Sequence, residues 1–252
     1  MICDAHIHVG EFFNGLYFTP AEIAAWARQC GAGKFLFFQT ARSGGYGAAY
    51  AQFLKDCAEL KSLAGGAAIP ALWLTLDAFK EIEKYYLKDF AALKFHPQVE
   101  ENLSDADYEF VLKTAADLRL PLIIHTSADE YCSCGRIGKI CEHAKHSAVI
   151  LAHGRPFAEC LKVLQNSENI YADTAYMPPE EAEIFAESGV AGKLVFGSDF
   201  PIDRHFFPNE DAVARYENFR NRMQKILPPA ALFENFSKLF INSNPKQERK
   251  NI

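Results

Sequence analysis

Short apolar segments alternate with longer amphipathic segments from one end of the chain to the other. The short segments span residues 2–9, 34–39, 67–74, 91–96, 122–126, 148–153, 169–173 and 193–199. Their β-branched and apolar residues are typical of buried parallel strands, and the longer segments are typical of the helices that cross between such strands. The pattern therefore predicts repeated strand–helix units, and eight strands are the number that closes a barrel.

Helix start signals and the end of the chain define the extent of this barrel. Thr19-Pro20 precedes an expected helix over residues 21–29, and Ser104 with Asp107 precedes another helix. Two more helical patterns follow the eighth strand, at 209–227 and 229–240.

The remaining residues 244–252 form a polar tail that has little to bury and is expected to be frayed. No linker divides the rest of the chain. We therefore expect an α/β fold with one domain, residues 1–243. That domain is a single (β/α)8 TIM-like barrel, which can be distorted, with extra C-terminal helices.

Composition and charge narrow the class of function. Hydrophobic residues make up 49% of the 252 residues and charged residues 23%, which is the composition of a compact globular protein. The 32 acidic and 26 basic residues give a net charge of −6, which argues against a nucleic-acid partner. The longest apolar stretch, residues 64–76, is too short and too interrupted by glycine and proline to span a membrane. We expect a small-molecule substrate, and the oligomeric state stays open.

The N-terminus and the cysteines predict a cytoplasmic protein with reduced thiols. A signal peptide would need basic and then apolar residues where this chain has Asp4, His6 and His8. The seven cysteines are odd in number and scattered, unlike a disulfide framework. Cys132 and Cys134 raise the question of a structural zinc site, but they are separated by one residue instead of the usual two, and the role of the pair stays open.

Polar side chains gather at the carboxyl ends of the expected strands. His6 and His8 are two residues apart on the first strand, so both are expected to point to one face, together with Ile2 and Asp4. The other expected strands that end in such residues contribute Lys94, His96, His125, His153 and Asp199. In a closed barrel, the inner face and the carboxyl rim are where barrel enzymes place their chemistry.

This concentration of imidazoles predicts a metal ion. A lone buried histidine is more often satisfied by a backbone carbonyl. Several imidazoles and a carboxylate on one rim would instead compete for partners unless an electron-deficient centre lay between them. A divalent metal supplies that centre.

Five motifs occur in order along nearly the whole chain. They are Asp-Ala-His-Ile-His at 4–8, Ile-Ile-His-Thr at 123–126, Leu-Ala-His-Gly at 151–154, Phe-Gly-Ser-Asp-Phe-Pro at 196–201 and Glu-Asn-Phe-Ser-Lys-Leu-Phe at 234–240. Together they resemble the amidohydrolase superfamily, and most closely its amidohydrolase-related family, which contains metal-dependent hydrolases and nonoxidative decarboxylases.

The resemblance implies a set of ligands and a mechanism. Carried over residue by residue, it implies that His6, His8, His125 and Asp199 surround one divalent metal, with His153 beside the metal-bound water or the substrate. Three imidazoles and a carboxylate suit zinc, with manganese or iron as alternatives, and zinc lowers the pKa of a bound water to about 7. Asp199 can also accept the proton of that water, so Asp199 and His153 are the expected catalytic residues.

Lys94, His96 and Arg155 have other expected roles. Two-metal members of the superfamily carry a bridging carboxylated lysine or a glutamate on strand 3 or 4, which makes Lys94 a candidate bridge to a second metal. Pairing with Asp4 or lining the pocket are the other interpretations of Lys94, and we expect one metal. His96 lies where a strand becomes a loop, and Arg155 closely follows His153, so both are candidate substrate-binding residues.

The expected function is that of a metal-dependent hydrolase, which uses a metal-activated water on a small ester, lactone or amide. A metal-dependent nonoxidative decarboxylase has the same ligand set, so fold and metal site do not separate the two. A deoxyribonuclease of the superfamily is disfavoured, because the chain carries Lys94 and His96 where such enzymes have an acidic residue. A non-catalytic metal-binding barrel is the remaining alternative.

Overall fold

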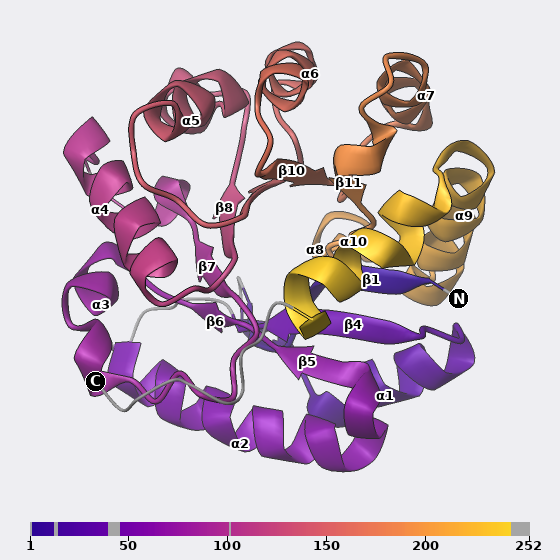
Figure 1. The fold of residues 1–252 in the computed structure, drawn as a ribbon. Coiled ribbons are helices and arrows are strands. Elements are labelled where there is room, and N and C mark those ends of the chain that lie inside the picture. The colour runs from indigo at the N-terminus through magenta and orange to yellow at the C-terminus, as the bar shows by residue number, and fades with distance from the viewer. Residues whose placement is uncertain (1, 13–14, 40–45, 101, 243–252) are drawn as a thin grey trace.

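The computed structural model describes the chain apart from residues 1, 13–14, 40–45, 101 and 243–252 (Figure 1). Parallel strand segments form a curved ring, and every one of the eight expected strands is present. The segments are β1 (Cys3–His8), β4 (Lys34–Phe38), β5 (Ala68–Pro70), β6 (Leu72–Trp73), β7 (Leu93–Phe95), β8 (Leu122–His125), β9 (Val149–Ala152), β10 (Ile170–Asp173) and β11 (Leu194–Val195). β5 and β6 are the two parts of the strand expected at 67–74. The expected end of the domain at 243 and the tail at 244–252 lie outside the described residues.

Backbone hydrogen bonds join the first and the last strand of this series. β1 pairs with β4 and β4 with β5, while β6 to β11 pair consecutively. At the seam, the N–H of Ala5 donates to the carbonyl of Phe196 at 2.8 Å, and the N–H of His8 donates to the carbonyl of Phe200 at 2.9 Å. Ile7 and Phe200 also form a parallel bridge. The expected TIM-like barrel is confirmed, with the segment after β11 completing the ring.

Most of the helices lie around the outside of the ring, whereas α10 lies across one end of it (Figure 1). Their bounds are α1 (Pro20–Gln29), α2 (Tyr46–Ala64), α3 (Leu76–Lys80), α4 (Asp105–Asp117), α5 (Cys134–Cys141), α6 (Phe157–Asn166), α7 (Pro179–Glu187), α8 (Asp203–Phe206), α9 (Ala212–Ile226) and α10 (Asn235–Ser237). Thr19 and Ser104 each accept a hydrogen bond from the backbone N–H three residues on, and Glu22 and Asp107 return it, so both start signals are confirmed. None of the helices described is long and apolar enough to cross a membrane.

The C-terminal part of the chain departs from a regular helix. The helix expected at 229–240 is the short α10 flanked by π-helical turns at Ala230–Glu234 and Lys238–Asn242. Three of its side chains enter the apolar cluster inside the barrel: Phe236, Leu239 and Phe240. The side chain of Asn235 donates to the carbonyls of Gly192 and Leu194, at the start of β11. These residues close the amino-terminal end of the barrel, opposite the expected rim.

The first strand contains a β-bulge that simple alternation does not predict. Between Asp4 and Ile7 the chain advances three residues along β1, while the paired strand β4 advances only two. Ile2 packs in the apolar layer outside the barrel, whereas Cys3 and Ala5 face the inside. The expectation that Ile2 and Asp4 share the face of the two histidines is therefore wrong, because the extra residue changes the face of every side chain that follows it.

The hairpin of β2 (Gly10–Glu11) and β3 (Tyr17–Phe18) and the short helix α8 are further elements that the apolar pattern did not predict. Both lie in connections that follow barrel strands at the carboxyl rim.

Candidate metal centre

The side chains expected at the rim come from separate barrel strands. His6 and His8 belong to β1, His125 ends β8, His153 directly follows β9, and Asp199 lies in the segment after β11. His153 and Asp199 have positive φ angles, of 69° and 65°. Such left-handed backbone is uncommon outside glycine and is concentrated at functional sites, where the surrounding structure holds it.

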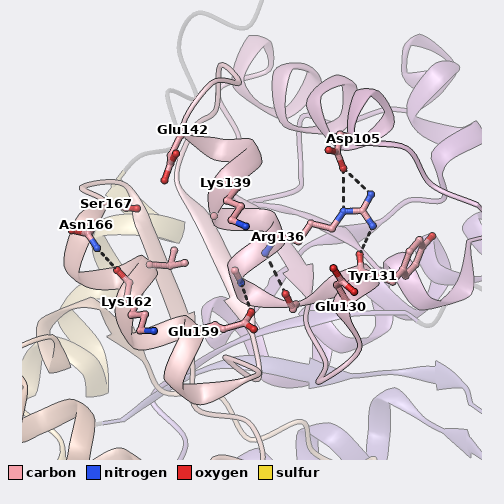
Figure 2. A pocket seen from close by; sticks show the side chains of 14 residues that line it. Asp105, Glu130, Tyr131, Arg136, Lys139, Glu142, Glu159, Lys162, Asn166 and Ser167 are labelled. Atoms are coloured by element: carbon pink, nitrogen blue, oxygen red, sulfur yellow. Dashed lines mark hydrogen bonds and ion pairs between the residues drawn. The ribbon is translucent and has the colours of Figure 1, made fainter.

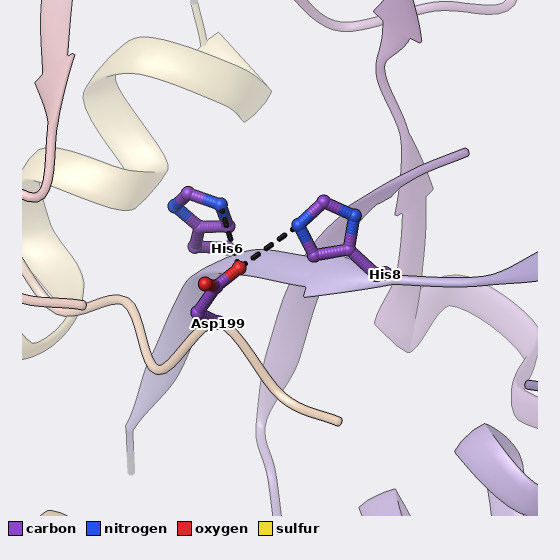
Figure 3. A group of neighbouring side chains, drawn as sticks. All are labelled: His6, His8 and Asp199. Carbon is purple, nitrogen blue, oxygen red and sulfur yellow. Dashed lines mark ion pairs between the residues drawn. The ribbon is translucent and has the colours of Figure 1, made fainter. Parts of the chain in front are cut away.

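Three of these side chains converge on one point (Figure 3). Asp199 Oδ1 lies 2.9 Å from His8 Nε2 and 3.1 Å from His6 Nε2. The three residues are buried, and one donor atom from each lies within 4.8 Å of the other two. Zinc ligands at about 2.0–2.1 Å in a tetrahedral site are about 3.3 Å apart, so this spacing fits a single metal ion.

Asp173, which sequence analysis did not single out, orients His6. Its Oδ2 lies 2.7 Å from His6 Nδ1, which leaves His6 Nε2 directed at Asp199. Its Oδ1 accepts hydrogen bonds from the backbone N–H groups of His153 at 2.9 Å and Ala175 at 3.1 Å. A carboxylate that binds the far nitrogen of a metal-ligating histidine fixes the ring and is common in metal sites. One feature of the sequence could have identified Asp173: it is the last residue of the seventh expected strand, at the carboxyl rim.

The pairing of His6 with Asp173 shifts both pKa values. Burial, the largest single influence, would lower the pKa of His6, but the Asp173 and Asp199 carboxylates together raise it to about 9. Burial would raise the pKa of Asp173, but His6 lowers it to about 2. The two groups therefore form an ion pair at neutral pH, and a metal that binds His6 Nε2 displaces a proton.

Gly197 makes room for this pair. A Cβ at position 197 would lie 3.0 Å from His6 Cβ and 3.2 Å from Asp173 Cβ. Glycine in the Phe-Gly-Ser-Asp motif thus lets the segment after β11 approach β1 and β10 closely.

Three further imidazoles pack beside the converging donors. The ring centre of His153 lies 5.0 Å from that of His6 and 4.7 Å from that of His125, and the ring of His96 stacks on His125 at 3.8 Å. Burial lowers the pKa of His153 to about 3 and holds the pKa values of His125 and His96 well below the usual value. All three rings are therefore neutral at neutral pH.

His125 does not join the three converging donors. Its ring nitrogens do not belong to the group of donor atoms that all lie within 4.8 Å of one another. Its ring lies against His96 and His153 instead. The role of His125 as a fourth ligand stays a prediction.

His96 is not one of the three converging donors, and Arg155 follows His153 closely in the chain. The ring of His96 is stacked between Trp73, at 5.1 Å, and His125. Arg155 is partly buried, and its backbone N–H donates to Thr126 Oγ1 at 2.9 Å. Their roles in substrate binding stay predictions.

Lys94 and Asp4 do not pair, which corrects one interpretation of the sequence. Asp4 Oδ1 accepts hydrogen bonds from the backbone N–H groups of His6 at 3.0 Å and Ser198 at 3.1 Å. Lys94 Nζ lies 5.1 Å from the centre of the Phe38 ring and has no hydrogen-bond partner in the described part of the chain. The bulge in β1 explains the separation, because it turns Asp4 away from the inside of the barrel.

Cys132 and Cys134 are buried and contact hydroxyl groups. Cys132 Sγ lies 3.1 Å from Ser127 Oγ, and Cys134 Sγ lies 3.7 Å from Thr126 Oγ1. Within the described residues, neither belongs to a group of metal-ligating side chains.

A groove of about 950 Å³ lies elsewhere, between α5 and α6 on the outside of the barrel (Figure 2). Some of its charged side chains contact one another or the backbone. Arg136 Nη2 lies 2.7 Å from Asp105 Oδ1, and Glu159 accepts a hydrogen bond from the N–H of Gly135 at 2.8 Å. The expected site residues do not line it, so the groove is not the centre of the chemistry.

A parallel α/β barrel with two histidines and an aspartate at the carboxyl ends of its strands has the arrangement of a metal-dependent barrel enzyme. The Amidohydrolase family model matches residues 3–232. The chain therefore belongs to the amidohydrolase family and is an enzyme of that family. No curated protein is similar enough in sequence to serve as a relative.

Solved structures show the same fold at low sequence identity. A probable 2-pyrone-4,6-dicarboxylic acid hydrolase from Acinetobacter baumannii, with citric acid bound, has 13% identity and a TM-score of 0.67 over 95% of this chain and 98% of that chain. An amidohydrolase from Burkholderia multivorans, with bound zinc, has 11% identity and a TM-score of 0.68 over 95% and 99%. The IDCase of Metarhizium anisopliae in apo form has 11% identity and a TM-score of 0.65 over 98% of each chain.

Proposed function

We propose that this protein is a metal-dependent hydrolase that acts on an ester, lactone or amide bond of a small organic molecule. The observation that carries the proposal is the convergence of His6 Nε2, His8 Nε2 and Asp199 Oδ1. Asp173 contacts the other ring nitrogen of His6, Nδ1. Imidazole and carboxylate donors of this kind suit zinc, with manganese or iron as alternatives. The zinc bound to the Burkholderia multivorans amidohydrolase supports the same choice.

Each residue has its own task in this proposal. His6, His8 and Asp199 would hold one metal ion, and His125 is the proposed fourth ligand. When bound, a divalent metal supplies a Lewis acid and a water nucleophile that is available near neutral pH. Asp199 accepts the proton of the attacking water, because its carboxylate has a second oxygen beside the point where the donors meet. His153 is neutral at neutral pH, so its ring can accept a proton from the substrate or hold it by a hydrogen bond.

The remaining rim residues would contact a small-molecule substrate. Arg155 carries a guanidinium that can bind a carboxylate with two parallel hydrogen bonds. His96 presents a flat, neutral ring next to His125. We propose both as substrate-binding residues. We also propose that the protein has neither a nucleic acid nor a membrane as a partner.

Elemental analysis of protein purified without added metal tests the proposal first. We expect about one zinc, manganese or iron per chain, bound by the converging donors of His6, His8 and Asp199. His6→Ala should lose the metal, and His143→Ala, which removes an exposed imidazole, should retain it. The metal-loaded protein is then screened against esters, lactones and amides. Absence of metal from the wild type, with no change in stability or activity on adding metal, would refute the proposal.

A nonoxidative decarboxylase is the second candidate. The Metarhizium anisopliae IDCase shares the fold over 98% of each chain. The same donors would hold the metal, and an arginine would hold the carboxylate. Release of CO2 from carboxylated aromatic compounds, without hydrolysis of any ester, lactone or amide, would favour this candidate over the hydrolase.

A further inference from the structure

Lys94 is a buried ammonium group that the proposed mechanism does not use. Its side chain is 1% exposed, and Nζ has no hydrogen-bond partner among the residues that the structure describes. Its register partners on the neighbouring strands are Trp73 and Ile123, which both line the inside of the barrel. Lys94 therefore points into the barrel as well. Burying an unpaired ammonium group is costly, so a partner from outside the chain is expected.

The ammonium group lies near the candidate metal centre. Its Nζ is 5.1 Å from the centre of the Phe38 ring, and that ring centre lies 5.0 Å from His6 and 4.7 Å from His8. The Phe38 ring is therefore a shared neighbour of the ammonium group and of the two histidine rings.

The charges around the centre do not balance when a divalent metal is bound. Asp173 and Asp199 are the buried carboxylates in contact with the metal-binding side chains. The imidazoles are neutral as metal ligands. Two negative charges inside the barrel then face a dication and the Lys94 ammonium, whereas the third buried carboxylate nearby, Asp4, is turned away from the inside. The interior therefore carries a net positive charge, which favours binding of an anion.

We propose that Lys94 makes this centre selective for substrates that carry a carboxylate near the bond that reacts. A carboxylate is the common organic monoanion, and it accepts charge-assisted hydrogen bonds from an ammonium group. Lys94 is then a specificity-determining residue, which decides what binds beside the metal and does not hold the metal itself. This inference rests on the metal-dependent function proposed above.

The other interpretation of Lys94, a carboxylated lysine that bridges two metals, changes the charge in the opposite direction. Carboxylation joins the neutral amine to CO2, releases a proton and leaves a negative carbamate. A carbamate would attract a second cation, whereas an ammonium group repels the first. Lys94→Met should therefore raise the affinity for zinc by roughly tenfold if Lys94 is an ammonium group. The same variant should lose a metal ion if Lys94 is a bridge.

The direct test compares a carboxylate with its uncharged analogue. Zinc-loaded wild type and Lys94→Met are titrated with acetate and with acetamide at constant ionic strength in chloride, and binding is followed by the melting temperature. We expect acetate to raise the melting temperature of the wild type and acetamide to leave it unchanged. Lys94→Met should bind acetate roughly tenfold more weakly and keep one zinc per chain. Lys113→Met removes a lysine that is 66% exposed and should behave as wild type.

Three results overturn the inference: equal acetate affinity in the wild type and in Lys94→Met, no acetate response in zinc-loaded wild type, or a carbamate carbon signal after equilibration with ¹³C-labelled bicarbonate. If Lys94→Met does not fold, Lys94→Gln serves in the same comparison, and the contrast between acetate and acetamide in the wild type needs no variant. Absence of metal from the wild type would show instead that the proposed function fails, and elemental analysis reveals that independently of the acetate titration.

Discussion

Replacing Asp173 by asparagine tests what the buried pair with His6 contributes. The Asp173 carboxylate accepts one hydrogen bond from His6 Nδ1 and two from backbone N–H groups. Asparagine accepts only through Oδ1, so its amide nitrogen would face a donor in this site. Removing one partner of a buried ion pair costs about 3–5 kcal/mol. Asp173→Asn should therefore lower the free energy of unfolding of the metal-free protein by an amount in that range.

The pKa shifts of the pair give an independent magnitude and a pH dependence. Raising the pKa of His6 from 6.5 to about 9 corresponds to about 3 kcal/mol, at 1.36 kcal/mol for each pH unit. Because the folded pKa of His6 is raised, this stabilisation is fully present below pH 6.5 and is lost as the pH rises through about 9. The pKa of Asp173 is lowered from 3.8 to about 2, so its contribution is lost as the pH falls through that interval. The difference between wild type and variant should be largest between about pH 4 and pH 6.5.

Urea unfolding of metal-free wild type and Asp173→Asn at about pH 5.5, 7.5 and 9.5 measures this difference. Asp117→Asn is the control, because Asp117 forms exposed ion pairs with Lys113 and Lys145 and should leave the free energy of unfolding close to that of the wild type. Competition with a chelator should show roughly 10- to 100-fold weaker metal binding in Asp173→Asn. Equal stability at about pH 5.5, together with unchanged metal affinity, would refute the role assigned to Asp173.

The remaining predictions concern neighbouring groups. Gly197→Ala should lower the free energy of unfolding by about 1–3 kcal/mol in urea and weaken metal binding in the chelator assay, because the added methyl group crowds His6 and Asp173. Its control is Gly192→Ala, whose Cβ would meet nothing within 4 Å. Asn235→Ala should cost about 1–3 kcal/mol in urea and leave the metal content unchanged, since it removes the side-chain donor from the buried carbonyl of Leu194 and from the exposed carbonyl of Gly192. Asp199→Asn should stay folded and lose turnover, whereas His153→Asn should lose turnover and retain the metal; loss of metal from the latter would make His153 a ligand.

The barrel could be predicted from the sequence because each strand is a separate apolar segment with a helix signal after it. The same reasoning could not predict the hairpin of β2 and β3 or helix α8, since these elements have no apolar period of their own. It also could not predict the π-helical turns around α10, which depend on how that segment packs into the end of the barrel.

Asp173 and Asp4 show where alternation along a strand predicts the site correctly and where it fails. Alternation on β10 places Tyr171 inside the barrel, so the same rule places Asp173 inside, and the structure agrees. Alternation on β1 places Asp4 beside His6 and His8, and the structure disagrees because the bulge inserts one residue. The motifs identify His6, His8 and Asp199 as residues that converge, but the backbone geometry decides which further carboxylate contacts them. The difference between the two strands is one extra residue, and no apolar or polar pattern along β1 records it.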